Sequence, residues 1–312
     1  MRIIINATFV LLSLLATLNA TAAVAPLADP VETPVQRVAT LEFLQTETAL
    51  ALGIEPVAVT DPKGYRRWVG AGSEHLDGAR DLGTRQEPDL EGLIAAEPDL
   101  IVGSWWRNGP VADRLQDIAP TLLYDGLPDA GDSNQYARMR AIVRDLGKRT
   151  GRDETADRVL ERLDARIDAQ RARLAEAGLA GTPVILAQSV PGTTRLRLFT
   201  DNSLAVRIAE AVGLRNAWPG DGNAYGFDTV DLKRLAGIED AHMLWVTDPD
   251  APVIEKLRAS RLWQALPVVT AGHVHPLPED TWFFGGPLSA MRLAERLTDT
   301  LAGAASNGQV AQ

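Results

Sequence analysis

Apolar residues recur at helical spacing through residues 153–177, a stretch without proline or glycine. This period predicts one uninterrupted helix of about 37 Å, at a rise of about 1.5 Å per residue. The apolar stripe spans too few heptads to indicate a coiled coil. We therefore expect a helix that braces two parts of the molecule. The repeating apolar positions are Val159, Leu160, Leu163, Ile167 and Leu174.

Short runs rich in Val, Ile and Leu occur on both sides of this helix, with helical stretches between them. Short buried strands that alternate with helices are typical of parallel sheets covered on both faces. The fold class that this order predicts is α/β, with two Rossmann-like lobes built on mainly parallel sheets and joined by the long helix. The predicted strands are residues 37–41, 56–59, 99–103 and 121–124 in the first lobe, and residues 183–189, 195–200, 242–247 and 274–277 in the second.

The chain of 312 residues is longer than one ordinary hydrophobic core supports. We expect a first lobe over residues 24–132, a helical linker over residues 133–178 and a second lobe over residues 179–312.

Two sequence patterns of the first lobe recur in the second lobe. The pattern of Asp-Leu, then Leu, then Glu in residues 89–102 recurs 142 residues later in residues 231–244. Residues 50–54 likewise resemble the end of residues 208–214, where an apolar helix is stopped by glycine. Both echoes indicate a duplicated architecture with insertions. Chance similarity between α/β units is the alternative.

Residues 1–23 have the pattern of a secretory signal peptide. Arg2 provides the positive start, residues 3–18 are largely apolar, and small residues follow up to the expected cleavage after Ala22 or Ala23. The apolar run is short for a membrane span, so an uncleaved anchor is only an alternative. We expect the mature chain in the bacterial periplasm, with no part inserted in the membrane.

Cysteine is absent from the sequence, which excludes disulfides, thiolate metal ligands and a lipid-modified cysteine. The net charge of −10 argues against nucleic acid and anionic membrane surfaces as partners. We expect a monomer.

The four histidines do not show the spacing of a metal site. His75 stands alone in a glycine-rich loop and His242 opens a predicted strand. His273 and His275 share a strand face that we expect to be solvated, and a metal held by this pair with a third ligand is the alternative. Ser289 lacks the partners of a hydrolase triad, and phosphate or dinucleotide motifs are missing. The sequence therefore predicts no catalytic residues, no cofactor and no direct metal site.

Three consecutive aromatics, residues 282–284, lead into Gly-Gly-Pro, which marks a loop before a helix. In an extended segment alternate side chains point to the same side, so Trp282 and Phe284 are candidates for a ligand-facing wall. Core packing is an equally good interpretation for Phe283.

The other tryptophans divide into two groups. Trp245 and Trp263 have the surroundings of core residues. The remaining ones fall in predicted loops of both lobes, which favours a binding cleft between the lobes. These loop aromatics are Trp68, Trp105, Trp106, Trp218 and Tyr225.

Five segments together have a specific pattern: YRRWV at residues 65–69, DLGTRQEP at 81–88, NAW at 216–218, LWQALP at 262–267 and WFFGGPLSAM at 282–291. In these segments the chain resembles the periplasmic ferric-hydroxamate siderophore-binding proteins of bacterial ABC importers, over nearly the whole mature length. The resemblance implies a class III periplasmic binding protein, with a shallow cleft that holds an iron-loaded chelator.

The resemblance also implies individual roles. Trp68, Tyr225, Trp282 and Phe284 match cleft aromatics of the family, and Arg85 matches an arginine that contacts the iron-binding oxygens. Three hydroxamates cancel the charge of ferric iron and leave electron-rich oxygens, which suit rings and a fork-shaped donor. Iron is thus expected inside the ligand. The alternative for Arg85 is a salt bridge to a nearby acid, either Glu87 or Asp89.

Three positions depart from the family pattern. Asn108 stands before Gly-Pro where a cleft tyrosine is usual, with the bulk of Trp105 and Trp106 just upstream. Tyr225 replaces a usual tryptophan, and Phe284 a usual tyrosine. A catecholate siderophore therefore stays open as a ligand, since Arg66, Arg67, Arg85 and Arg107 provide positive charge. Haem, a corrinoid and an esterase acting on the chelate are further alternatives.

The resemblance also implies docking to an ABC permease through a pair of acidic residues, one on each lobe. Glu91 matches the first acid. Lys233 occupies the second position, and Asp231 is a substitute two residues earlier. A solvated helix face is the other interpretation of both acids.

Overall fold

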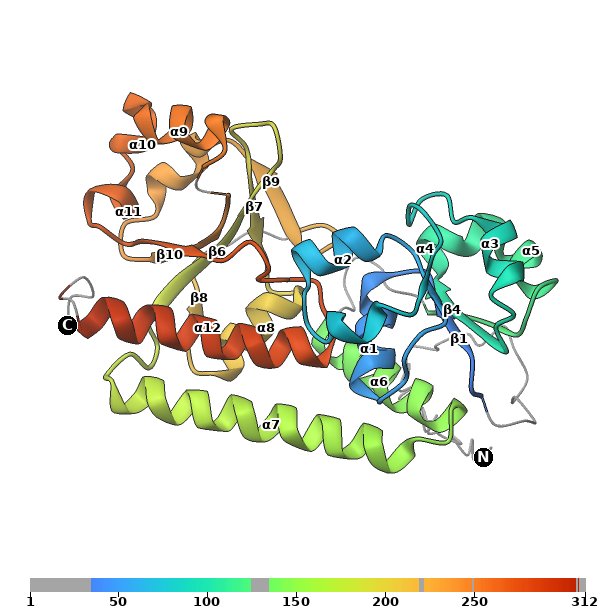
Figure 1. Cartoon of the computed structure of the whole chain (residues 1–312). Coiled ribbons are helices and arrows are strands. Elements are labelled where there is room, and N and C mark those ends of the chain that lie inside the picture. Colours follow the sequence, from blue (N-terminus) through green and yellow to red (C-terminus); the bar gives the residue numbers. More distant parts are fainter. Residues whose placement is uncertain (1–34, 125–134, 219–221, 249, 307, 309–312) are drawn as a thin grey trace, which may run out of the picture.

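The structure is a computed structural model that describes residues 35–124, 135–218, 222–248, 250–306 and 308. The predicted signal peptide, residues 1–23, lies outside the described residues, as does the predicted boundary at residue 132. Two sheets lie side by side, with long helices along one side of both (Figure 1). The predicted two-lobed α/β fold is confirmed.

The first lobe is built on a wholly parallel sheet in the order β3-β2-β1-β4-β5. All four predicted strands are present. Strand β3 was not predicted because it is an exposed Arg-Asp pair rather than an apolar run. The elements are β1 Val38–Thr40, α1 Phe43–Ala51, β2 Ala58–Val59, α2 Pro62–Trp68, η1 Ser73–Leu76, β3 Arg80–Asp81, α3 Leu90–Ala95, β4 Leu100–Ser104, α4 Trp105–Asn108, η2 Gly109–Val111, α5 Ala112–Gln116 and β5 Thr121–Tyr124.

The second lobe has a mixed sheet in the order β11-β10-β6-β7-β9, with β8 also paired to β6. Strand β7 runs antiparallel to β6 and β9, and the other pairs are parallel. The four predicted strands are again present, whereas β8 and β9 were not predicted. The elements are β6 Pro183–Ser189, β7 Leu196–Phe199, α8 Leu204–Ala211, β8 Arg215–Asn216, β9 Phe227–Val230, η3 Leu232–Gly237, β10 His242–Val246, α9 Pro252–Ala259, α10 Arg261–Gln264, α11 Pro267–Thr270 and β11 Val274–Leu277.

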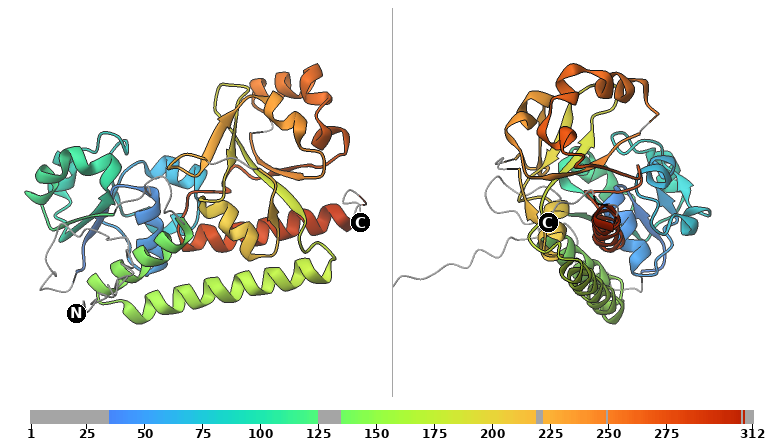
Figure 2. Two further views of the ribbon diagram at one scale, coloured as in Figure 1. Left: turned by 180° about the vertical axis from the view of Figure 1, so that it is seen from behind. Right: turned by 90° about the vertical axis from the view of Figure 1, so that its left-hand side faces the viewer.

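Three helices connect the lobes: α6 Gln135–Arg149, α7 Asp153–Glu176 and α12 Pro287–Ser306. The predicted uninterrupted helix is α7, which packs along α12 and α6 and runs beside both sheets (Figures 1 and 2). Its buried face joins one apolar core that extends from Leu100 of the first sheet through Leu163 of α7 to Leu186 of the second sheet. The lobes are therefore braced by shared packing as well as by chain connection.

The sequence echoes correspond to repeated structural units. Helix α3 feeds the buried strand β4, and the 3-10 helix η3 feeds the buried strand β10. Helices α1 and α8 end with the same hydrogen bond, Ile54 N to Ala49 O and Leu214 N to Ala209 O, each 2.9 Å. In both turns a glycine with positive φ, Gly53 or Gly213, allows the reversal.

A buried carboxylate ties the first lobe to the start of α12. Glu47 of α1 accepts hydrogen bonds from the Ser289 backbone N (2.6 Å) and Ser289 Oγ (2.8 Å). Burial raises the pKa of Glu47, and the donors from the helix start oppose that shift. A Cβ on Gly286 would lie 3.1 Å from the Glu47 carboxyl carbon, so glycine permits this close approach.

In the described part of the chain, the structure contains no helix that combines the length and the apolar character of a membrane span.

Candidate ligand-binding cleft

The cleft lies at the carboxyl edges of the strands in both lobes, where ligands bind in open α/β sheets. In the first lobe, Glu42 follows β1, Asp61 follows β2, and Arg85 comes after β3. In the second lobe, Ser189 ends β6 and Trp282 follows β11. Because parallel strands end at one edge, residues far apart in sequence meet there.

Two adjoining cavities of about 350 and 360 Å³ form the cleft. Arg85, Arg197 and Trp282 line both of them, so the cavities are two halves of one site. The first half is also lined by Glu42, Phe43, Gln45, Ser104, Trp106, Arg107, Tyr225, Phe227 and Phe284. The second is also lined by Arg67, Trp68, Gln188, Ser189, Asp248 and Glu279.

A series of touching aromatic rings runs along the first half of the cleft and joins the lobes at both ends. Phe43 of the first lobe contacts Trp282 at 5.6 Å between ring centroids, and Trp106 of the first lobe contacts Tyr225 of the second at 5.7 Å. The rings between them are 5.1 to 5.9 Å apart, mostly edge to face or tilted, which are favourable geometries. In order, the series is Phe43, Trp282, Phe284, Phe227, Tyr225 and Trp106.

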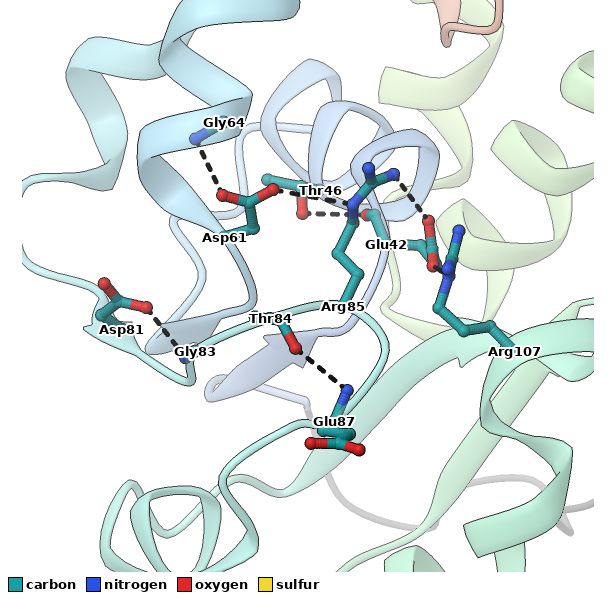
Figure 3. Close-up of polar contacts among 10 residues, drawn as sticks. All are labelled: Glu42, Thr46, Asp61, Gly64, Asp81, Gly83, Thr84, Arg85, Glu87 and Arg107. Carbon is teal, nitrogen blue, oxygen red and sulfur yellow. Dashed lines mark hydrogen bonds and ion pairs between the residues drawn. The ribbon is translucent and has the colours of Figure 1, made fainter. Parts of the chain in front are cut away.

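Arg85 is held by charge and by a ring. Its guanidinium donates to Glu42 Oε2 at 3.4 Å and lies 3.8 Å from Asp61 Oδ2 (Figure 3). It also sits 3.8 Å from the centroid of the Phe43 ring. The expected alternative partners were wrong. Glu87 points away from the guanidinium in Figure 3, while the Asp89 carboxylate caps α3 by accepting from the backbone N of Glu91 and Gly92.

Glu42 is the centre of the charged network. Arg107 donates through Nε to Glu42 Oε1, on the side opposite Arg85. Burial raises the pKa of Glu42, and the two arginines oppose that rise. Although Glu42 occupies the position before α1, its carboxylate does not cap that helix. The side chain is instead committed to the cleft.

Three donors on the cleft wall have no hydrogen-bond partner among the described residues, although they are buried. They are Arg85 Nε, Ser104 Oγ and Trp282 Nε1. An unmet buried donor costs about 1–3 kcal/mol, so such groups are retained where a ligand satisfies them. Their common requirement is a ligand rich in acceptor oxygens.

Six of the nine ligand-binding residues predicted from the sequence line the cleft: Trp68, Arg85, Trp106, Tyr225, Trp282 and Phe284. The alternation in the aromatic triplet is also present, since Phe283 is fully buried in the core. Trp245 and Trp263 are core residues as predicted.

The other three predicted residues do not line the cleft. Trp218 is buried in the second lobe, where its Nε1 donates to Asp228 at 2.9 Å. Asn108 is buried and accepts from the Ser104 backbone N, which closes the turn after β4. Trp105 is 47% exposed and covers Gly109 on the outside of α4. Adjacent helix positions point in different directions, so only Trp106 of the pair reaches the cleft.

The sequence did not point to Glu42, Phe43, Phe227 or Arg197. The first two precede or begin an apolar helix, and Phe227 lies in an unpredicted strand. Arg197 alternates with buried leucines in a predicted strand. The neighbouring Phe199 on that same face was the signal that the face is covered.

The two expected docking acids are exposed, one on each lobe. Glu91 lies in the first turn of α3, and Asp231 precedes η3 and forms a 3.5 Å ion pair with Arg195.

The histidines correct one expectation. His275 is buried rather than solvated, and its Nε2 lies 2.9 Å from His242 Nδ1. The His273 ring stacks on His242 with centroids 4.0 Å apart. Among the described residues, no group of three or more His, Asp or Glu has the arrangement of a metal site.

Comparison with known sequences agrees with this geometry. The sequence profile of the periplasmic binding protein family matches residues 38–281, so the chain belongs to the periplasmic binding protein family. The iron(3+)-hydroxamate-binding protein FhuD of Escherichia coli is 32% identical, covering 86% of this chain and 88% of the relative. The Fe(3+) dicitrate-binding periplasmic protein FecB of the same organism is 24% identical, over 83% of this chain and 82% of the relative.

Among solved structures, the Fe3+-Desferal-bound siderophore-binding protein FhuD from Vibrio cholerae is similar, with a TM-score of 0.78 and 29% identity. The match covers 86% of this chain and 98% of that structure. These homologues are named as binding proteins for iron chelates.

Proposed function

We propose that this chain is a periplasmic substrate-binding protein that captures a ferric siderophore, with the hydroxamate type favoured, and delivers it to an ABC importer of the inner membrane. The observation that carries the proposal is the combination of a ring-lined cleft with unmet donors from Arg85, Ser104 and Trp282. A ferric hydroxamate presents an apolar periphery and acceptor oxygens, which are complementary to both features.

In this proposal the chelator provides the whole coordination shell of the iron, and the protein provides none of it. Trp68, Trp106, Tyr225, Trp282 and Phe284 contact the periphery of the complex. Arg85 donates to the iron-binding oxygens while Glu42 and Phe43 fix the plane of its guanidinium. Glu42 thus orients the donor rather than the ligand.

Export and delivery complete the proposal. Residues 1–23 direct the chain across the inner membrane, and the lobes of the mature monomer correspond to residues 24–132 and 179–312. Glu91 and Asp231 meet positive charges on the permease. The chain performs no catalysis: the hydroxyl of Ser289 is buried and donates to Glu47, which is unsuited to a nucleophile.

Fluorescence titration of the purified mature protein tests the proposal, because tryptophans lie in the cleft. We expect one equivalent of a ferric trihydroxamate to quench emission with a Kd of about 1 µM or tighter. Uncomplexed ferric iron should not bind stoichiometrically. Binding of haem, cobalamin or a ferric catecholate, without any response to hydroxamates, would replace this assignment with one of those ligands.

A further inference from the structure

Arg197 is a cleft arginine that takes no part in the ion-paired network of Arg85, Arg107 and Glu42. It lies in β7 directly opposite Gln188 of the antiparallel neighbour β6. Its guanidinium donates to Gln188 Oε1 at 3.1 Å and sits 5.0 Å from the centroid of Phe227. The alternation of β7 places Leu196 and Leu198 in the core and turns Arg197 toward the first lobe, beside Phe199.

Among the described residues, the guanidinium of Arg197 has no neutralising carboxylate. In the described part of the chain, no acid lies within ion-pair distance of it, whereas Arg85 and Arg107 both contact Glu42. Burial alone lowers the pKa of Arg197, so the charge is partly desolvated without a compensating anion. Its protein partners are a neutral amide and a ring.

The position of Arg197 makes its charge accessible to any bound ligand, because it lines both halves of the cleft. The charge of the site also differs from that of the molecule. Among the described residues that line the cleft, arginines outnumber carboxylates, although the whole chain has a net charge of −10. The arginines are Arg67, Arg85, Arg107, Arg138 and Arg197, and the carboxylates are Glu42, Asp248 and Glu279.

We propose that Arg197 is a specificity-determining residue that selects ferric chelates carrying a negative charge outside the iron-binding groups, such as a pendant carboxylate. This proposal rests on the proposed function and specifies its ligand class. An ionised carboxylate forms a paired, charge-assisted contact with a guanidinium, which a neutral or cationic group at the same place does not. The partial burial of the guanidinium strengthens the preference.

A matched ligand series tests the charge preference without changing the iron centre. Ferrioxamine B carries a free ammonium, its N-acetyl derivative is neutral there, and its N-succinyl derivative carries a carboxylate. We expect the wild-type protein to bind the N-succinyl form about tenfold more tightly than ferrioxamine B, with the N-acetyl form between them. The preference should shrink as ionic strength rises.

Two variants assign the preference to one residue. Arg197→Gln should bring the three affinities within about twofold of one another, with the largest loss of affinity for the N-succinyl form. Arg195→Gln is the matched control, since Arg195 lies just outside the same strand and pairs with Asp231 away from the cleft. It should keep the wild-type preference.

The outcomes separate the two proposals. If no member of the series bound the wild-type protein, the hydroxamate assignment itself would fall. Tight and equal binding of all three by the wild type would overturn the role of Arg197 alone, and this result does not require a folded variant. Equal loss of preference in both variants would assign the effect to the general field of the lobe and would also overturn it.

Discussion

The two walls of the cleft handle positive charge in opposite ways. On the first lobe, Arg85 and Arg107 share the carboxylate of Glu42, so the guanidinium groups are held in place before a ligand arrives. On the second lobe, the contacts of Arg197 with described residues are to Gln188 and the ring of Phe227. The paired wall is preorganised to donate hydrogen bonds to neutral oxygens, while the unpaired wall retains attraction for an anion. One cleft can therefore separate recognition of the iron centre from recognition of overall charge.

The largest expected effect comes from removing the donor of the paired wall. Arg85→Ala should weaken binding of ferric N-acetyl-ferrioxamine B by roughly 2 kcal/mol, about thirtyfold, because a charge-assisted contact is lost. Arg85→Lys should recover only part, since an ammonium lacks the planar fork. Trp282→Ala should cost a similar amount through lost ring contact. Fluorescence or calorimetric titration measures all three.

Stability of the ligand-free protein is the control for this experiment. Arg107 still neutralises Glu42 in Arg85→Ala, so we expect a loss of less than about 1 kcal/mol in the free energy of unfolding. A strongly destabilised apo protein with unchanged affinity would show that Arg85 is only the structural partner of Glu42.

Removing the charge of Glu42 should give the first-lobe wall of the cleft an attraction for anions like that of the second-lobe wall. Glu42→Gln keeps the shape of the side chain, removes the counter-charge of Arg107 and, among the described residues, leaves Arg85 with the carboxylate of Asp61 alone. We expect affinity for the N-succinyl derivative to rise about fivefold, near 1 kcal/mol, while affinity for the N-acetyl form changes less or falls. A uniform change across the ligand series would contradict the view that Glu42 acts as a counter-charge.

The lobes should also differ in acid sensitivity. Burial lowers the pKa of His242 to about 4, so His242 is neutral in the folded state at pH 6, and burial also lowers the pKa of His275. The unfolded chain binds their protons near pH 6.5, and stability is therefore complete above that pH and lost as the pH falls toward 4. In the first lobe, His75 is exposed and beside Glu55.

His275→Gln tests this difference by removing one titrating group. The wild type should be the more stable protein at pH 7.5, and its advantage should shrink at pH 5, because the unfolded chain binds a proton at His275 more readily than the folded one. Urea unfolding at the two pH values measures it. An advantage that grew on acidification would mean that the pair holds a proton in the folded state.

The smallest expected effect is on shape. The core that runs from Leu100 through α7 to Leu186 opposes wide closure of the lobes, so ligand addition should change the radius of gyration by less than about 0.5 Å. Small-angle scattering of free and ferrioxamine-loaded protein checks this. A marked compaction would show that the shared core bends as a hinge.

The sequence predicted the fold well because its signals are local and strong. Each signal follows from one physical requirement. The apolar period of α7 reflects its buried face, the apolar runs reflect buried strands, and the glycines after α1 and α8 reflect the positive φ of a helix end. Strands β3 and β9 were not predicted because partially exposed or very short strands lack an apolar run. The antiparallel direction of β7 depends on contacts between strands, which no local pattern encodes.

The site was predicted only in part, because some of its residues have a local sequence signal and others are brought together only by the fold. Three aromatic residues directly before a Gly-Gly-Pro loop signal are an unusual combination, so Trp282 and Phe284 could be recognised from the sequence. Glu42 and Arg197 are ordinary charges in sequence, and only the meeting of strand ends reveals that one lies between two arginines and the other opposite an amide. Trp218 shows the converse, because a tryptophan in a loop can still find a buried partner.

A crystal structure of the complex with ferrioxamine B tests the central claim most directly. The claim predicts iron held only by the three hydroxamates, with rings of Trp282 and Phe284 against the chelator and the Arg85 guanidinium within hydrogen-bond distance of its iron-binding oxygens. A protein oxygen or nitrogen in the coordination shell of the iron, or a chelate bound away from Arg85 and Trp282, would contradict it.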